Sequence, residues 1–239
     1  MRYLFPVFLP ILFVSISAWA GTWRDDFNDG DLDGWRMDKH IWKERVIPDA
    51  GNWWVEDGVV IGGEEAPGVT HALTVKGGWD WSDYTVEVSV KLIKQLQLWQ
   101  AVSLYLTPDG NKASGLEVRN VLGSVVARGF IYEAPAMANP IGPWKPFKIE
   151  VSKWYRLKIK IVERIDDEEG IVQCFIDDQP ILQFQGYRKG TPGFSVYQTI
   201  AMFDDFVVTG PDIPDGGSGA KAVRPKGKLA TTWARVKMF

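Results

Sequence analysis

An acidic loop near the start of the chain has the spacing of calcium ligands. Asp29, Asp31 and Asp33 alternate along the chain and are followed by Gly34, which matches the first half of a looped calcium site. The second half of an EF-hand is missing, because the twelfth position holds His40 in place of a bidentate glutamate. Either other acids complete a structural calcium site, or the loop is a run of Asx turns before the first strand. We favour the Asx turns, and the sequence requires no cofactor.

A second group of side chains could bind a sugar. In an extended segment over residues 98–107, alternate side chains face opposite sides, so Trp99 and Tyr105 share one side. Antiparallel pairing with the next two strands would add charged and phenol groups to the same surface: Glu117, Arg119 and either Arg128 or Tyr132. Aromatic faces stack on the C–H faces of sugar rings, and charged groups bond the hydroxyls. The pattern predicts a ligand-binding surface; the alternative is an ordinary Glu–Arg pair beside packed aromatic rings.

Motifs for catalysis are few. A retaining glycosidase needs two carboxylates about 5 to 5.5 Å apart, and the Glu-x-Asp-x-Glu arrangement of sandwich-fold glucanases is absent. The chain has two histidines, His40 and His71, and it has no Gly-x-Ser-x-Gly elbow or phosphate loop. A binding module needs no catalytic residue. Under a glycan-cleaving alternative, Glu117 is the one carboxylate that we nominate.

Short strands are the elements that position these side chains. Residues 84–92 and 155–162 alternate between apolar and polar types, as a strand with one buried face requires. Similar runs predict strands at residues 53–61, 98–107, 116–120, 125–132, 171–176, 181–184 and 201–209, with turn chemistry between them, for example at Thr191-Pro192-Gly193. Because no helical periodicity separates the strands, they must pair antiparallel. This predicts an all-β sandwich of two sheets, with a barrel as the second choice.

The two ends of the chain differ from its body. Arg2, an apolar run over residues 4–16 and the small-x-small site Ala18-Trp19-Ala20 predict a signal peptide over residues 1–20 and a secreted or periplasmic location. An uncleaved membrane anchor is the alternative, and no later stretch is apolar enough to span a membrane. We expect one β-sandwich domain over residues 21–210, a Pro/Gly-rich linker over residues 211–219 and a basic tail over residues 220–239.

Charge is distributed unevenly along the chain. The 27 Lys and Arg and 30 Asp and Glu give a formal net charge of -3, and six of the basic residues lie in the tail, which has no acid. Without these six and Arg2, the body keeps 20 basic residues against 30 acidic ones, a charge of about -10. This body offers no cationic field for nucleic acid. The basic tail is either frayed or docks to a partner.

Several short motifs resemble the concanavalin A-like lectin/glucanase superfamily in its laminin-G-like bacterial form. They are Asp26-Phe-Asn-Asp-Gly30, Gly34-Trp35, Trp81-Ser-Asp-Tyr84, Trp154-Tyr-Arg-Leu157 and Phe203-Asp-Asp-Phe-Val-Val208. The resemblance implies a jelly-roll sandwich with a concave sheet, in a superfamily of lectins, binding modules, glycosidases and lyases. Trp54-Val-Glu-Asp-Gly58 and Ser114-Gly-Leu-Glu-Val-Arg119 are also similar to 3-keto-disaccharide hydrolase-like proteins. The last strand differs from that group, since Phe203-Asp-Asp-Phe206 stands where an Arg-Asn pair is expected.

Three functions fit these observations. The signal peptide, the 12 tryptophans, the predicted surface and the absent acid dyad favour a secreted, non-catalytic module that recognises polysaccharide or another extracellular glycan. The similarity to the hydrolase-like group leaves a glycan-cleaving enzyme as the first alternative. A structural or adhesive module whose basic tail docks to a partner is the second alternative.

Overall fold

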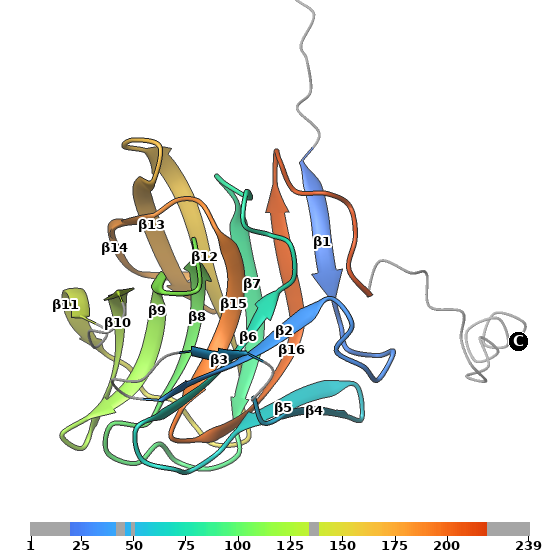
Figure 1. Ribbon diagram of the computed structural model, residues 1–239. Helices are drawn as coiled ribbons and strands as arrows, with labels where there is room; N and C mark the ends of the chain where they lie inside the picture. The colour runs from blue at the N-terminus through green and yellow to red at the C-terminus, as the bar shows by residue number, and fades with distance from the viewer. Residues whose placement is uncertain (1–19, 42–45, 49–50, 134–138, 219–239) are drawn as a thin grey trace, which may run out of the picture.

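Two antiparallel sheets pack against each other in the computed structural model, which describes residues 20–41, 46–48, 51–133 and 139–218 (Figure 1). The described residues form no α-helix. The first sheet has the order β14 (Gln179–Tyr187), β13 (Glu169–Ile176), β12 (Trp154–Arg164), β7 (Thr85–Leu92), β16 (Ile200–Gly210), β5 (Val59–Gly63) and β4 (Trp53–Glu56), with β1 (Gly21–Asp25) paired to β16. The second sheet has the order β11 (Asn139–Pro146), β10 (Ser124–Glu133), β9 (Lys112–Val121), β8 (Ala101–Thr107), β15 (Thr191–Tyr197), β6 (Val69–Val75), β2 (Trp35–Ile41) and β3 (Val46–Pro48). The prediction of an all-β jelly-roll sandwich is confirmed.

Alternation of apolar residues explains the strands that the sequence predicted best. In β7, Val86, Val88, Val90 and Leu92 are buried, while the residues between them are partly exposed. The same alternation in β12 places its apolar side chains in the core beside those of β7, with which it pairs. These strands form the middle of the first sheet.

An aromatic cluster fills the core between the sheets. Trp35 on β2 meets Phe206 on β16 and Phe194 on β15, with ring centroids 4.8 and 5.3 Å apart. The Trp35 indole Nε1 donates a hydrogen bond of 2.7 Å to Oδ2 of Asp25, which is fully buried. Burial raises the pKa of Asp25 above its usual value. Aromatic contacts therefore tie both sheets together at this end of the sandwich.

One part of each sheet differs from the sequence prediction. Thr191-Pro192-Gly193, expected as a turn, begins the central strand β15. Pro192 is tolerated there because β15 pairs with β6 only from Gly193 onward, so the missing N–H of the proline interrupts no ladder on that side. The predicted strand over residues 53–61 is a hairpin of β4 and β5, which turns at Asp57 and Gly58 with positive φ at both residues.

The segment after β16 packs back along β1. Ile213 is buried in the core, and Gly216 forms a parallel bridge with Trp23. The Thr22 amide donates to Oδ1 of Asp215 at 2.9 Å. Residues 211–218 of the expected linker are thus held against the domain, because Ile213 has an apolar side chain to bury and β1 has free backbone groups to pair.

The predicted signal peptide, up to residue 19, and the basic tail lie outside the described residues. Within the described part, no helix is long and apolar enough to cross a membrane.

Candidate functional site

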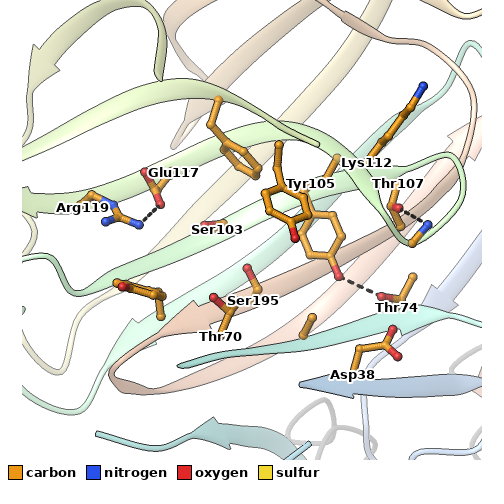
Figure 2. Close-up of a pocket in the computed structure, with 16 residues that line it drawn as sticks. Asp38, Thr70, Thr74, Ser103, Tyr105, Thr107, Lys112, Glu117, Arg119 and Ser195 are labelled. Carbon is orange, nitrogen blue, oxygen red and sulfur yellow. Dashed lines mark hydrogen bonds and ion pairs between the residues drawn. The ribbon is translucent and has the colours of Figure 1, made fainter. Parts of the chain in front are cut away.

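An open pocket lies on the outer face of the second sheet (Figure 2). Six strands line it: β2, β6, β15, β8, β9 and β10. The period of two along each strand selects the lining side chains. In β8, Leu104 and Leu106 face the core while Ser103, Tyr105 and Thr107 face the pocket. The pocket is therefore the reverse side of the strands that build the core.

Glu117 and Arg119 line the charged end of the pocket, and Arg128 pairs with Glu117 beside it. Arg128 on β10 lies opposite Glu117 on β9, and its Nε donates to Glu117 Oε2 at 2.7 Å. Arg119, two residues along β9, donates from Nη2 to Glu117 Oε1 at 2.8 Å. The side chains of Glu117 and Arg128 are only 5% and 7% exposed. Both carboxylate oxygens thus accept charge-assisted hydrogen bonds in a buried setting.

Aromatic rings hold the two guanidinium groups in place. Arg119 lies over the ring of Tyr197 with its Cζ 4.8 Å from the centroid, and Arg128 lies over Trp144 at 5.4 Å. Cation–π contacts of this kind add to the ion pairs. Tyr197 also lines the pocket.

The middle of the pocket is apolar and aromatic. Tyr105, Phe130 and Ala72 form a small buried cluster of their own, and Tyr132 packs against it. The hydroxyl groups of Tyr105 and Thr74 are 2.8 Å apart and share a hydrogen bond. Burial raises the pKa of Tyr105 well above its usual value, so the phenol stays neutral.

A second carboxylate lies on the side of the pocket formed by β2. Asp38 is 4% exposed, and its Oδ1 accepts a hydrogen bond of 2.9 Å from Nε of Arg36. The Arg36 guanidinium in turn lies 5.5 Å from the ring centroid of Trp79. Like Glu117, Asp38 is held in an ion pair with an arginine.

The structure brings four of the five predicted ligand-binding residues together. Tyr105, Glu117, Arg119 and Tyr132 line the pocket. Trp99 does not: it precedes β8, has a φ of 68° and is 44% exposed. The strand begins only at Ala101, because the Gln100 amide donates to the Gln97 carbonyl at 3.0 Å and closes a turn before it.

Part of the pocket comes from residues that the sequence interpretation did not include. Asp38, Thr70, Thr74, Ser195 and Tyr197 belong to β2, β6 and β15. None of these three segments was expected as a strand. Their polar residues alternate with core residues in β6 and β15, and this was the available signal.

The acidic loop is organised by its own backbone. The amides of Asp31 and Asp33 donate to the Oδ1 atoms of Asp29 and Asp31, at 3.4 and 2.8 Å. These are Asx turns. Across the described ranges, no three His, Cys, Asp or Glu side chains are grouped so that they could hold a metal ion. The choice between Asx turns alone and calcium binding by Asp29, Asp31 and Asp33 stays a prediction.

The model of one known protein family matches most of the domain. The family model of the 3-keto-alpha-glucoside-1,2-lyase-like domain matches residues 22–195, from β1 into β15. The chain belongs to this family. The match confirms the similarity to 3-keto-disaccharide hydrolase-like proteins, and it includes the pocket residues Asp38, Glu117 and Arg119.

Solved structures share the fold of this family member at low sequence identity. The carbohydrate binding module CBM66 from Bacillus subtilis has a TM-score of 0.56 at 18% identity, covering 74% of this chain and 96% of the module. A Bacillus subtilis protein of unknown function with a galectin-like fold has a TM-score of 0.54 at 15% identity, covering 78% and 94%. A glycoside hydrolase family 16 endo-glucanase from Bacteroides ovatus has a TM-score of 0.51 at 12% identity, covering 78% and 97%. These similarities confirm the concanavalin A-like jelly-roll fold. No curated protein matches the sequence of this chain.

Proposed function

We propose that the protein binds a carbohydrate in the pocket of the second sheet and does not cleave it. The observation that carries the proposal is the state of the two pocket carboxylates. Glu117 has both oxygens bonded to guanidinium groups, and Asp38 is bonded to Arg36. A general acid or base must exchange a proton with the substrate. Carboxylates fixed by arginines in this way serve to shape a binding surface.

The remainder of the pocket supports sugar binding. The rings of Tyr105, Tyr132 and Tyr197 offer faces for the C–H groups of a sugar. Ser103, Ser195 and the threonines of β6 offer hydroxyl groups that can donate and accept hydrogen bonds. A few polar groups around an apolar floor are typical of small-ligand sites. The fold shared with a carbohydrate binding module agrees with this use of the sheet.

The family name favours glycan cleavage as the second candidate. A 1,2-lyase removes the proton on C2 of a sugar and the leaving group on C1, so it needs a base near C2 and an acid near the glycosidic oxygen. In this pocket Glu117 is the carboxylate that we nominate for such a role. It would first have to leave one of its arginines.

Variants of two aromatic residues test the binding proposal. Tyr132→Ala removes a pocket ring, whereas Trp99→Ala removes an exposed ring outside the pocket. By analogy with rings stacked on nucleic-acid bases, loss of a stacked ring costs about 1 to 3 kcal/mol, which is about 5- to 150-fold in affinity. Retardation in native gels containing a panel of glycans should fall for Tyr132→Ala and be unchanged for Trp99→Ala. Equal retardation of both variants and wild type would place the site elsewhere.

A turnover assay separates the two candidates. The same glycans and 3-keto-glucosides are incubated with the protein, and new reducing ends or unsaturated sugars are measured. Binding without turnover is the expected result. Turnover by wild type that is lost in Glu117→Gln, while circular dichroism shows the variant to be folded, would replace the binding module with the lyase or hydrolase.

The predicted signal peptide adds a location to this proposal. A protein exported to the periplasm or beyond would meet extracellular glycans there. A fractionation that finds the protein, shortened by 20 residues, outside the cytoplasm is expected. A full-length protein in the cytoplasm would contradict export.

A further inference from the structure

At the charged end of the pocket, the positive charges outnumber the negative ones by one. Two arginines, Arg119 and Arg128, face one carboxylate, Glu117. All three side chains are largely buried, with exposures of 14%, 7% and 5%. A buried charge is costly unless a partner of opposite sign lies beside it. The cluster therefore carries a net charge of about +1 where water cannot fully solvate it.

Arg119 also has hydrogen-bonding capacity to spare. A guanidinium has five N–H donors, and one Nη2 donor of Arg119 bonds Glu117. Its Nε is buried and has no hydrogen-bond partner among the described residues. The Cζ of Arg119 lies 4.8 Å from the centroid of the Tyr197 ring. Arg119 lines the pocket (Figure 2). Buried donors normally have acceptors, so an acceptor that enters the pocket would complete this site.

The other charged groups around the pocket do not add to this buried charge. Asp38 is neutralised by Arg36 at 2.9 Å. Lys112, at the far end, is partly exposed, and its Nζ lies 5.9 Å from the centroid of the Tyr187 ring. The buried excess of positive charge thus lies in the Glu117 cluster, in a body whose 20 basic and 30 acidic residues make it strongly acidic. A local positive site on an acidic protein selects its ligand by charge.

We propose that the pocket binds an anionic sugar, with the carboxylate of a uronic acid paired to Arg119. This inference rests on the proposed function and names the class of its ligand. A planar carboxylate matches the fork of a guanidinium better than a hydroxyl does. The sugar ring would then lie toward the aromatic floor of Tyr105, Phe130 and Tyr132.

Paired polymers that differ only in charge test the inference. Polygalacturonate, alginate and hyaluronan are compared with the same polymers after reduction of their carboxyl groups, using the purified protein in affinity gels at low salt. Wild type should bind at least one acidic polymer about tenfold more tightly than its reduced form, since the charge-assisted bond is lost on reduction. Arg119→Gln should remove this preference. It leaves Glu117 paired with Arg128, so the buried carboxylate keeps a partner.

Arg156→Gln is the matched control. It removes the same charge from the opposite sheet, where Arg156 bonds Glu87 at 2.9 Å. This variant should keep the preference for the acidic polymer. If Arg119→Gln does not fold, wild type still decides the matter, because binding of the acidic polymer must weaken as salt rises while binding of the reduced form must not.

The outcomes separate this inference from the proposed function. Equal binding of acidic and reduced polymers by wild type would overturn the anionic ligand and leave sugar binding intact. A preference that survives Arg119→Gln would overturn the role of Arg119. Failure of wild type to bind any polymer, acidic or neutral, would overturn the proposed function and this inference with it.

Discussion

Glu117 and Arg128 lie directly opposite each other on β9 and β10, and the arginine Nε donates to the glutamate at 2.7 Å. The pair is almost completely buried, yet it lies on the outer face of its sheet beside the pocket. Buried ion pairs contribute little net stability compared with apolar packing. Such a pair at a pocket is consistent with a role in ligand binding, which is the central claim of our proposal.

Removal of the Glu117 charge should destabilise the fold strongly. Glu117→Gln leaves two buried guanidinium groups without a counterion, which costs about 3 to 5 kcal/mol. Glu87→Gln is the control, because Glu87 pairs with Arg156 and Lys158 on a partly exposed surface, and its change should cost about 1 kcal/mol or less. Urea unfolding measures both free energies. Similar stabilities for the two variants would contradict the buried ion-pair account.

Stability should fall as the pH drops below about 6.5. His71 is 1% exposed, and its Nδ1 accepts a hydrogen bond from the Asn52 amide at 3.1 Å. Burial lowers the pKa of His71, although Glu64 at 3.3 Å opposes the shift. The unfolded chain therefore takes up a proton first as the pH falls, which lowers the free energy of unfolding until the folded pKa is reached.

Two histidine variants assign this pH dependence. His71→Gln should reduce the change in thermal midpoint between pH 7.5 and 5.5. His40→Gln, which replaces the other histidine of the chain, should not. The same slope in wild type and His71→Gln would show that another group is responsible.

A second ion pair should govern stability at acidic pH. Arg188 has a 5% exposed side chain, and its Nε donates to Asp83 Oδ1 at 3.1 Å. The Arg188 guanidinium holds the pKa of Asp83 below its usual value. The stability that this ion pair contributes is present above about pH 3.9. It is lost as the pH falls through the pKa of Asp83 in the folded protein. Because Asp83 is 39% exposed, Asp83→Asn should cost about 1 to 3 kcal/mol at pH 7, less than a fully buried pair.

Acid titration checks the Asp83 prediction. Unfolding free energies of wild type and Asp83→Asn should converge as the pH falls from 6 to 2.5. Curves that stay parallel over this range would rule out a contribution from the Asp83 ion pair.

Calcium should not change the stability of the protein. In the loop around Asp29, Asp31 and Asp33, carboxylates already accept hydrogen bonds from the backbone amides of Asp31 and Asp33. Thermal melts in calcium and in EDTA should therefore have the same midpoint. A higher midpoint in calcium, lost in Asp31→Asn, would establish the calcium site that the spacing also allows.

The charged end of the pocket could be predicted from the sequence because a strand alternates with a period of two. Burial of Leu116 and Val118 in the core turns Glu117 and Arg119 outward whatever the register. Trp99 could not be placed in the same way, because a turn before β8 breaks the alternation.

The part of the pocket formed by β2, β6 and β15 depends on long-range topology. β15 lies between β8 and β6, so Ser195 reaches the pocket only because Phe194 faces the core and the strand inserts there. No local pattern gives this order.

The number of tryptophans was one ground for expecting sugar binding, but the structure does not place them in the pocket. Trp35 and Trp53 pack in the core, and the described tryptophans do not line the pocket.

The location of a bound sugar tests the central claim most directly. A crystal structure of the protein with an oligosaccharide chosen from the binding panel should show the sugar against the outer face of the second sheet. We predict contacts with Tyr132, Tyr197 and Arg119, and no displacement of Arg128 from Glu117. A sugar bound on the first sheet, or at an exposed ring such as Trp54 or Trp99, would contradict the account.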